Sequence, residues 1–235
     1  MIDIELNPDK IIDTIERLER RVADRFPQSG LRSVCQDFIK ISHQTKGNID
    51  WISKPNLPVR IGSYCVIILG LIGLIYSFRH IDLGLNNTTI ANIATVCEAI
   101  FNDLLLLGAA IFFLISSETR LKRKKALKAL NELRVIAHVI DMHQLTKDPS
   151  LYNPNIKSTP NSPKRELNRY ELERYLDYCS EATSLIGKVA ALYSQSLPDA
   201  TVVSAVNEIE TLCNGFSRKI WQKIIILQNH EWKTA

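Results

Sequence analysis

The chain has 235 residues, enough for one or two domains, and its 29 basic and 25 acidic residues give a net charge of +4. This balance excludes the broad basic excess of a nucleic-acid-binding protein, so we expect no nucleic-acid partner. The five cysteines are widely spaced and include no CxxC pair, which argues against a disulfide framework and against a zinc site. The apolar residues are concentrated in two segments near the middle of the chain.

Residues 1–58 are predicted to form an N-terminal hairpin of two amphipathic helices. Asn7 is a suitable N-cap, and Pro8 suits the first helical position. Apolar residues then recur at helical spacing, and the segment 27–30, with its proline and glycine, separates the two helices. We expect this hairpin to pack onto the C-terminal helices, because both parts are predicted to lie on the cytoplasmic side of the membrane.

Residues 59–117 are predicted to form a transmembrane hairpin. The segment 61–78 carries no charged residue, and its length of about eighteen residues is near the lower limit for a helix that crosses a bilayer. The run 104–115 is entirely apolar. Because a span needs about twenty residues, the second membrane helix is predicted at about 96–117.

Basic residues near the ends of the membrane helices predict the orientation. The connecting loop has one, Arg79, together with two overlapping glycosylation sequons at Asn86 and Asn87. Six basic residues follow the second helix: Arg120, Lys122, Arg123, Lys124, Lys125 and Lys128. We therefore expect an integral membrane protein with both termini in the cytoplasm. These six residues are also candidates to bind anionic lipid headgroups, although they could serve only to fix the topology.

The second membrane helix carries polar side chains at membrane depth. Asp103 is the most unusual, because a carboxylate at the centre of a membrane helix costs about 2.5 to 3.5 kcal/mol on insertion scales. The polar residues near one face are Thr95, Glu98, Asn102 and Asp103. The apolar residues that continue this face are Leu106, Ala110 and Phe113. A pore with a hydrophobic gate is one interpretation, and it requires several copies of the chain.

Two other interpretations of Asp103 remain open. Its carboxylate could reach the outer headgroups or pair with a polar neighbour in the same chain. Alternatively, it could form a polar contact between copies of the chain.

Residues 118–148 are predicted to extend the second membrane helix into the cytoplasm. Their apolar residues alternate by four and three, a spacing typical of a coiled-coil seam. The seam residues are Ala126, Leu130, Leu133, Ala137 and Ile140. This seam and the small residues of the first membrane helix favour a homo-oligomer.

A linker with four prolines is predicted over residues 149–163, followed by C-terminal helices over 164–235. Ser162 is expected to cap the first of these helices. Around Trp221 the last helix is more apolar than one buried face requires.

No enzyme is indicated, because the chain contains no P-loop, GxGxxG or GxSxG motif. His138, Asp141 and His143 resemble a metal-ligand group in composition. His143, however, lies about 140° around the helix from His138, so one unbroken helix cannot direct all three at one ion. No metal and no cofactor are therefore expected.

The predicted fold is all-α: a two-helix transmembrane hairpin with N-terminal amphipathic helices and a cytoplasmic helical bundle. We expect a membrane-anchored interaction module, self-associating or bound to a soluble cytoplasmic protein. The alternative is an oligomeric channel or membrane-perturbing effector gated by the cytoplasmic helices. The layout resembles that of two-transmembrane effectors in bacterial conflict systems, a resemblance of architecture without a shared motif. A soluble helical protein with a very apolar central hairpin is the other architecture that fits the pattern.

Overall fold

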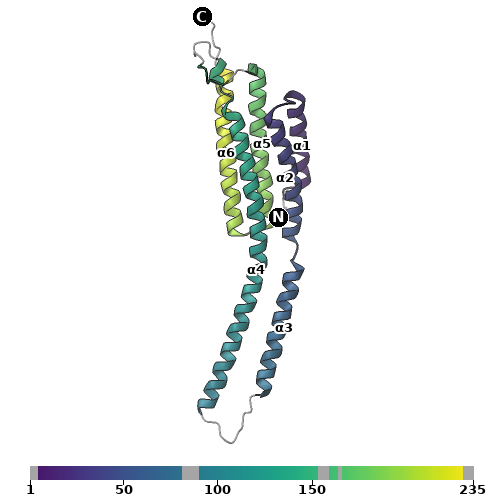
Figure 1. Ribbon diagram of the computed structural model, residues 1–235, viewed down its shortest axis with the longest axis vertical. Coiled ribbons are helices and arrows are strands. Elements are labelled where there is room, and N and C mark those ends of the chain that lie inside the picture. Colours follow the sequence, from purple (N-terminus) through teal and green to yellow (C-terminus); the bar gives the residue numbers. More distant parts are fainter. Residues whose placement is uncertain (1–4, 81–89, 153–158, 164–165, 230–235) are drawn as a thin grey trace. The chain divides into compact units, whose positions relative to one another are not determined.

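The computed structural model describes residues 5–80, 90–152, 159–163 and 166–229. Within these residues every regular element is a helix and no strand occurs, which confirms the predicted all-α class. The elements are α1 (Pro8–Arg25), α2 (Gly30–Ser53), α3 (Leu57–His80), α4 (Ile90–Leu145), the 3-10 helix η1 (Pro149–Tyr152), α5 (Arg169–Ser196) and α6 (Ala200–Asn229), labelled in Figure 1 except for η1.

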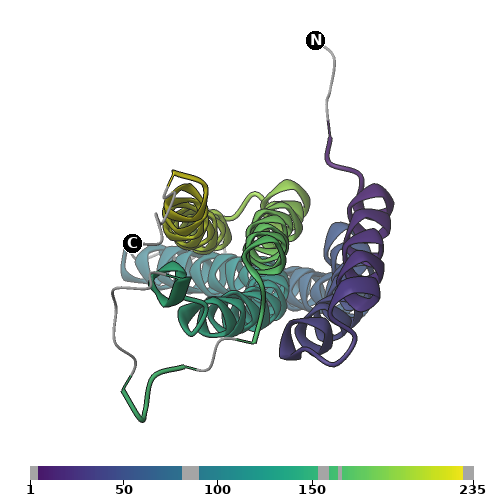
Figure 2. The same ribbon diagram turned by 90° about the horizontal axis from the view of Figure 1, so that it is seen from above.

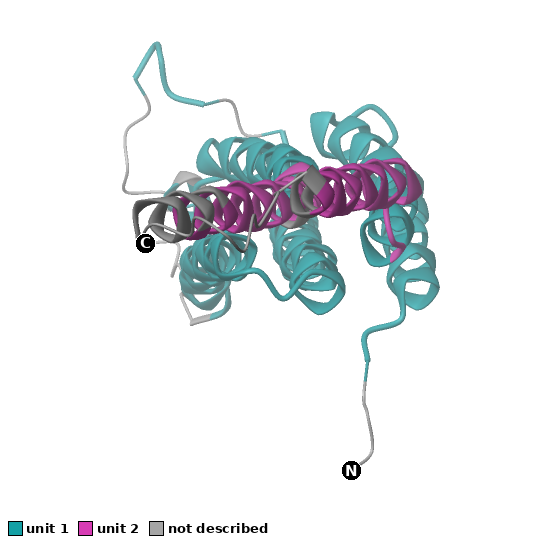
Figure 3. Cartoon of the chain, turned by 90° about the horizontal axis from the view of Figure 1, so that it is seen from below, with its two compact units in different colours: residues 1–53, 123–235 teal, residues 54–122 magenta. Residues whose placement is uncertain are grey.

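The chain forms two compact units, coloured separately in Figure 3. The first, here called the bundle, comprises residues 1–53 and 123–235, and the second, the apolar hairpin, comprises residues 54–122. Helix α4 contributes to both units, because it continues without a break from Ile90 to Leu145. The expected loop with the sequons at Asn86 and Asn87 lies outside the described residues.

Helix α1 begins at the predicted cap. The side-chain oxygen of Asn7 accepts hydrogen bonds from the backbone N–H groups of Asp9 at 2.9 Å and Lys10 at 3.2 Å, and Pro8 occupies the first turn. These bonds satisfy N–H groups that a helix leaves unpaired at its start. The buried residues of α1 are Ile11, Ile12, Ile15, Leu18 and Val22.

Helix α5 begins later than predicted, and the expectation that Ser162 caps it is wrong. The N-cap is Asn168, whose Oδ1 accepts a hydrogen bond from the backbone N–H of Glu171 at 2.8 Å. The Glu171 carboxylate in turn accepts one from the backbone N–H of Asn168 at 2.8 Å, which completes a capping box. Ser162 instead closes a turn, where its hydroxyl oxygen accepts a hydrogen bond from the backbone N–H of Thr159 at 2.8 Å.

Within the bundle, α5 contacts α6 and also α1 and α2 (Figure 2). This confirms that the N-terminal helices pack onto the C-terminal ones. The predicted seam on α4 is buried in the same core, with each residue at most 2% exposed: Ala126, Leu130, Leu133, Ala137 and Ile140. The chain itself therefore covers this seam, which removes one of the two reasons for expecting self-association.

Polar groups inside the bundle pair across helices. The hydroxyl of Tyr193 on α5 donates to Thr45 Oγ1 on α2 at 3.3 Å and accepts from Asn48 Nδ2 at 3.3 Å. The hydroxyl oxygens of Thr183 on α5 and Ser217 on α6 lie 2.9 Å apart. Because a buried polar group without a partner costs about 1 to 3 kcal/mol, these pairs favour one register of the helices over shifted alternatives.

Arg123 and Asp199 form a two-pronged ion pair between α4 and the start of α6. The guanidinium Nε donates to Oδ1 at 2.9 Å, and Nη2 donates to Oδ2 at 2.6 Å. Asp199 Oδ1 also accepts hydrogen bonds from the backbone N–H groups of Thr201 at 3.1 Å and Val202 at 3.3 Å. The pKa of Asp199 is lowered, first by the hydrogen bond from Arg123, so the carboxylate is ionised at neutral pH.

We expect Arg123→Gln and Asp199→Asn each to lower the thermal midpoint of the bundle. At pH 7 the double variant should lower the midpoint by less than the sum of the two single losses. Because the pKa of Asp199 is lower in the folded state than its unfolded value of about 3.9, the ion pair stabilises the folded state at pH values above about 3.9. This contribution is lost as the pH falls through the lowered pKa of Asp199, so the coupling should shrink as the pH falls below the unfolded value. Thermal unfolding followed by circular dichroism measures both effects.

A matched control is Arg134 and Glu208, which also join α4 to α6, with an N–O distance of 2.7 Å. This pair is more exposed, with 63% of the Glu208 side chain accessible, so its coupling should not exceed about 1 kcal/mol. If the losses of thermal midpoint in the Arg123 and Asp199 variants were strictly additive, the stabilising ion pair between these residues would be contradicted.

In the apolar hairpin, large apolar side chains of α3 and α4 are exposed rather than buried. Examples are Leu69, Ile72, Phe101, Leu105 and Phe112. Two helices of the described chain are long and apolar enough to cross a membrane by length and composition, and their apolar windows are not buried at all.

Candidate functional site

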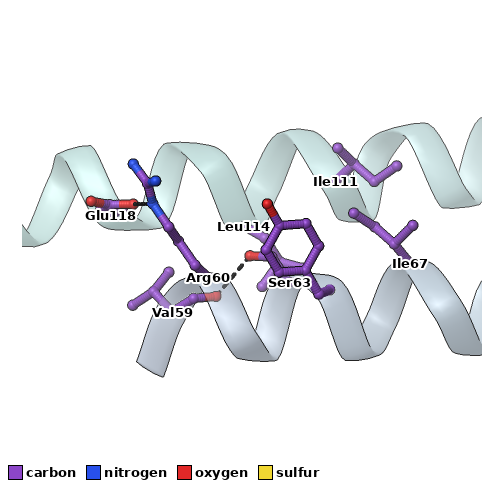
Figure 4. Close-up of a pocket in the computed structure, with 8 residues that line it drawn as sticks. Val59, Arg60, Ser63, Ile67, Ile111, Leu114 and Glu118 are labelled. Carbon is purple, nitrogen blue, oxygen red and sulfur yellow. Dashed lines mark hydrogen bonds and ion pairs between the residues drawn. The ribbon is translucent and has the colours of Figure 1, made fainter. Parts of the chain in front are cut away.

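Glu118 is the centre of a polar cluster at one end of the apolar hairpin. Its Oε1 accepts a hydrogen bond from the backbone N–H of Asn56 at 3.0 Å and lies 3.0 Å from Nζ of Lys122. Its Oε2 accepts from Nε of Arg60 at 3.4 Å (Figure 4). Asn56 immediately precedes α3, and Lys122 follows Glu118 by one helical turn, so one carboxylate joins the start of α3 to α4.

The pKa of Glu118 is lowered, and the largest cause is the hydrogen bond from the backbone of Asn56, followed by that from Lys122. Its side chain is only 17% exposed. Glu118 is therefore a carboxylate at neutral pH, held by donors from both helices.

A cleft of about 280 Å³ opens beside this cluster, within the apolar hairpin. Its lining residues are Val59, Arg60, Ser63, Tyr64, Ile67, Ile111, Leu114 and Glu118. Figure 4 shows Arg60 and Glu118 at one end of the cleft and Ile67 and Ile111 at the other. The Ser63 hydroxyl between them donates to the backbone oxygen of Val59 at 2.8 Å. The cleft thus has a charged mouth and an aliphatic interior.

A second cleft, of about 510 Å³, includes part of the predicted pore face. Asp103 is half-buried there, and Leu106 and Ala110 line the same cleft, opposite Gly70 and Gly73 of α3. Three other predicted residues do not line it: Asn102, Glu98 and Phe113 are exposed. The side chain of Thr95 lies outside the described residues. The predicted face is therefore divided between a groove and the exposed surface of α4.

Among the described glycines of the hairpin, Gly70 is the one at which an added side-chain carbon would meet a neighbour within 4 Å. A side-chain carbon at Gly70 would lie 2.6 Å from Cδ1 of Leu107, whereas Gly62 and Gly73 have no such neighbour within 4 Å. Of the three glycines of α3, only Gly70 therefore lies where a side chain would contact α4.

The six basic residues of α4 divide into two sets. Lys122 pairs with Glu118, Arg123 pairs with Asp199, and Lys125 lies over the ring of Trp51 at 4.4 Å. The exposed set, spaced by four residues and therefore on one face of α4, is Arg120, Lys124 and Lys128. Of the six, these three have neither an ion pair nor a ring contact in the described part of the chain.

His138, Asp141 and His143 make separate contacts within the bundle. The ring of His138 packs edge-on against Phe216, with centroids 5.6 Å apart, and Asp141 accepts a hydrogen bond from Gln144 at 2.7 Å. The half-buried ring of His143 lies against Gly30, and burial lowers its pKa. Among the described residues no group of three or more His, Cys, Asp or Glu side chains could hold a metal ion.

The sequence prediction missed the cluster around Glu118 and the cleft beside it. The spacing of Glu118 and Lys122 indicates a helical ion pair. The contribution of Asn56 and Arg60 depends on how α3 packs on α4, which no local pattern encodes.

Cys35, Cys179 and Cys213 are buried, and burial raises the pKa of Cys35 to about 12 and that of Cys213 to about 11. These thiols are therefore protonated at neutral pH and are poor nucleophiles.

No protein-family model, no curated protein and no solved structure shows a significant match to this chain. The functional argument therefore depends on the geometry of the clefts, the exposed surfaces and the charges.

We expect Gly70→Val to destabilise the apolar hairpin, because the added carbons meet the Leu107 side chain. Overpacking costs about 1 to 3 kcal/mol, and we expect the lower end of this range, because the contacted atom is Cδ1 of Leu107, the end of a flexible side chain. Gly73→Val is the matched control, since it adds the same atoms to the same helix at a position with no neighbour within 4 Å. Thermal unfolding in detergent micelles compares the two, and equal midpoints would contradict the close approach at Gly70.

Proposed function

We propose that the chain is an integral membrane protein in which α3 and the apolar part of α4 form a transmembrane hairpin. The exposed apolar surface of these helices carries the proposal. In water, exposed apolar area costs about 25 cal/mol per Å², and soluble proteins rarely expose large contiguous apolar patches. A bilayer removes this cost, and the helical hydrogen bonds satisfy the backbone there.

The charges support an orientation with both termini in the cytoplasm. Arg120, Lys124 and Lys128 follow the apolar part of α4 and are exposed, whereas Arg79 is the basic residue at the other end of α3. An excess of Lys and Arg close to the membrane favours the cytoplasmic side. The exposed set is also suited to anionic headgroups, at about 1 kcal/mol per residue near the surface.

In this proposal the bundle is the cytoplasmic interaction module. Its core is closed, yet it exposes apolar side chains on two helices: Val135, Met142 and Leu145 on α4, and Trp221, Ile225 and Ile226 on α6. Exposed apolar groups of this size favour contact with another protein, either a soluble partner or a second copy. Self-association through the α4 seam is not part of the proposal, because that seam is buried.

Membrane integration is tested by paired double substitutions. Leu69→Arg with Ile72→Arg introduces two charges into α3 and should sharply reduce the fraction of protein that resists alkaline carbonate extraction, at about 2.5 to 3.5 kcal/mol per central arginine. The control, Val135→Arg with Met142→Arg, changes bundle residues of comparable exposure, 53% and 66%. It should leave the extraction unchanged.

If the wild-type chain is released by carbonate, or if both double variants behave alike, the membrane proposal fails. Protease protection of terminal tags in sealed vesicles tests the orientation separately.

The alternative function is an oligomeric channel or membrane-perturbing effector. The observation that favours it is Asp103 in a groove whose lining continues as Leu106 and Ala110. A polar segment followed by an apolar constriction is a recognised arrangement for a gated pore. Two helices cannot enclose such a path, so at least four copies would be required.

Asp103→Leu separates the two functions. If Asp103 lines a pore, this variant should lose conductance in planar bilayers while its carbonate resistance stays intact. If the protein is an anchor, neither protein conducts, and removing the charge should raise the thermal midpoint in detergent. The protein mass of the solubilised particle, from light scattering, gives the copy number, and a monomer or dimer excludes a self-built pore.

A further inference from the structure

We propose that the cleft beside Glu118 binds one anionic phospholipid, with the lipid phosphate at Arg60 and the start of one acyl chain between α3 and α4. This inference rests on the proposed membrane placement of the hairpin. It differs from general attraction to the basic residues of α4, because it assigns a defined lipid to a defined cleft.

Arg60 is held in place while most of its donors stay available. Only its Nε contacts Glu118, and 55% of the side chain is exposed. Within the described residues its two Nη groups donate to no protein acceptor. A guanidinium presents its donors in a rigid fork that matches phosphate oxygens, and a carboxylate that fixes one edge reduces the entropy lost when a phosphate binds the other.

The charges at the mouth of the cleft favour an anion. Arg60 and Glu118 line the cleft, and Lys122, which is not a lining residue, neutralises Glu118 through its ion pair, so the three groups together have a net charge of +1. A single phosphodiester would neutralise this excess. Glu118 is already engaged by three donors, so it offers little to the ammonium group of a zwitterionic lipid.

The apolar end of the cleft suits an acyl chain. Val59, Ile67, Ile111 and Leu114 supply aliphatic walls. The volume of about 280 Å³ is just below the range for pockets that bury a whole small ligand, about 300 to 1,000 Å³. It therefore accommodates only the first part of one chain, and the remainder of the lipid would stay in the bilayer. Tyr64 lines the same cleft, as expected for an aromatic side chain at a membrane interface.

The larger cleft of the hairpin is unsuited to the same ligand. Asp103 is its charged residue, and no Lys, Arg or His side chain is among its lining residues. An anionic headgroup would be repelled there. The two clefts thus differ in the sign of their charge, and the position of Arg60 selects the first.

The test uses the full chain in nanodiscs of phosphatidylcholine and phosphatidylglycerol in equal parts, released and examined by native mass spectrometry. The wild type should retain one phosphatidylglycerol per copy in preference to phosphatidylcholine. Arg60→Gln should weaken this retention at least about tenfold, from the loss of charge-assisted hydrogen bonds. Arg60→Lys should retain part of it.

Arg120→Gln is the matched control, because it removes the same charge from an exposed residue that does not line the cleft. It should leave the bound lipid in place. Ile111→Trp fills the apolar end without changing any charge and should displace the lipid.

Equal losses in Arg60→Gln and Arg120→Gln would overturn the site in favour of diffuse electrostatic attraction, and so would an absence of retained lipid in the wild type. Carbonate extraction of every variant separates this failure from that of the proposed function. If the wild type resists extraction but retains no lipid, only the lipid site is rejected. If the wild type is extracted, both the lipid site and the membrane proposal are rejected.

Discussion

The change of polarity along one unbroken helix is the constraint on which the other features depend. Residues 104–114 of α4 are apolar and largely exposed, and beyond Glu118 the helix is amphipathic and contributes Ala126 and Leu130 to a closed core. A single helix therefore has two requirements for its surroundings. The bundle satisfies the second with the chain's own side chains, while the proposed membrane placement would satisfy the first on the faces of α4 that α3 does not contact.

Glu118 lies at the point where this change occurs, and its three donors explain why a carboxylate is stable there. A partly buried carboxylate is costly unless hydrogen bonds replace its hydration. Asn56 and Lys122 supply such bonds from the two helices, and Arg60 adds a third. The same arrangement orients Arg60 across the mouth of the cleft, so a contact that stabilises the helix pair also prepares a cation for an anionic ligand.

Local pattern was sufficient for the helical class, the cap at Asn7 and the continuity of α4. It was insufficient where two sites competed for the same role. Ser162 has the composition of an N-cap, but the capping box of Asn168 and Glu171 adds a second hydrogen bond and begins α5 there.

Periodicity alone also misassigned the partner of the α4 seam. A four-three spacing predicts that one face of a helix is buried. It does not indicate whether the helices that cover this face belong to the same chain or to another copy. The site beside Glu118 was unpredictable for a related reason, since Arg60 and Glu118 meet only after α3 and α4 pack.

The buried seam also limits how copies of the chain can associate. With that surface closed, the apolar groups left for a partner are the exposed side chains of the bundle, such as Met142 and Trp221, and the hairpin itself. Within a bilayer, apolar area gives no driving force between helices, so close packing and polar contacts must supply it. The groove with Gly73 and Asp103 offers both, because a small residue permits close approach and a carboxylate gains from a donor on a neighbouring helix. Oligomerisation in the membrane therefore has its strongest physical basis at this groove, which shares no lining residue with the proposed lipid cleft beside Glu118.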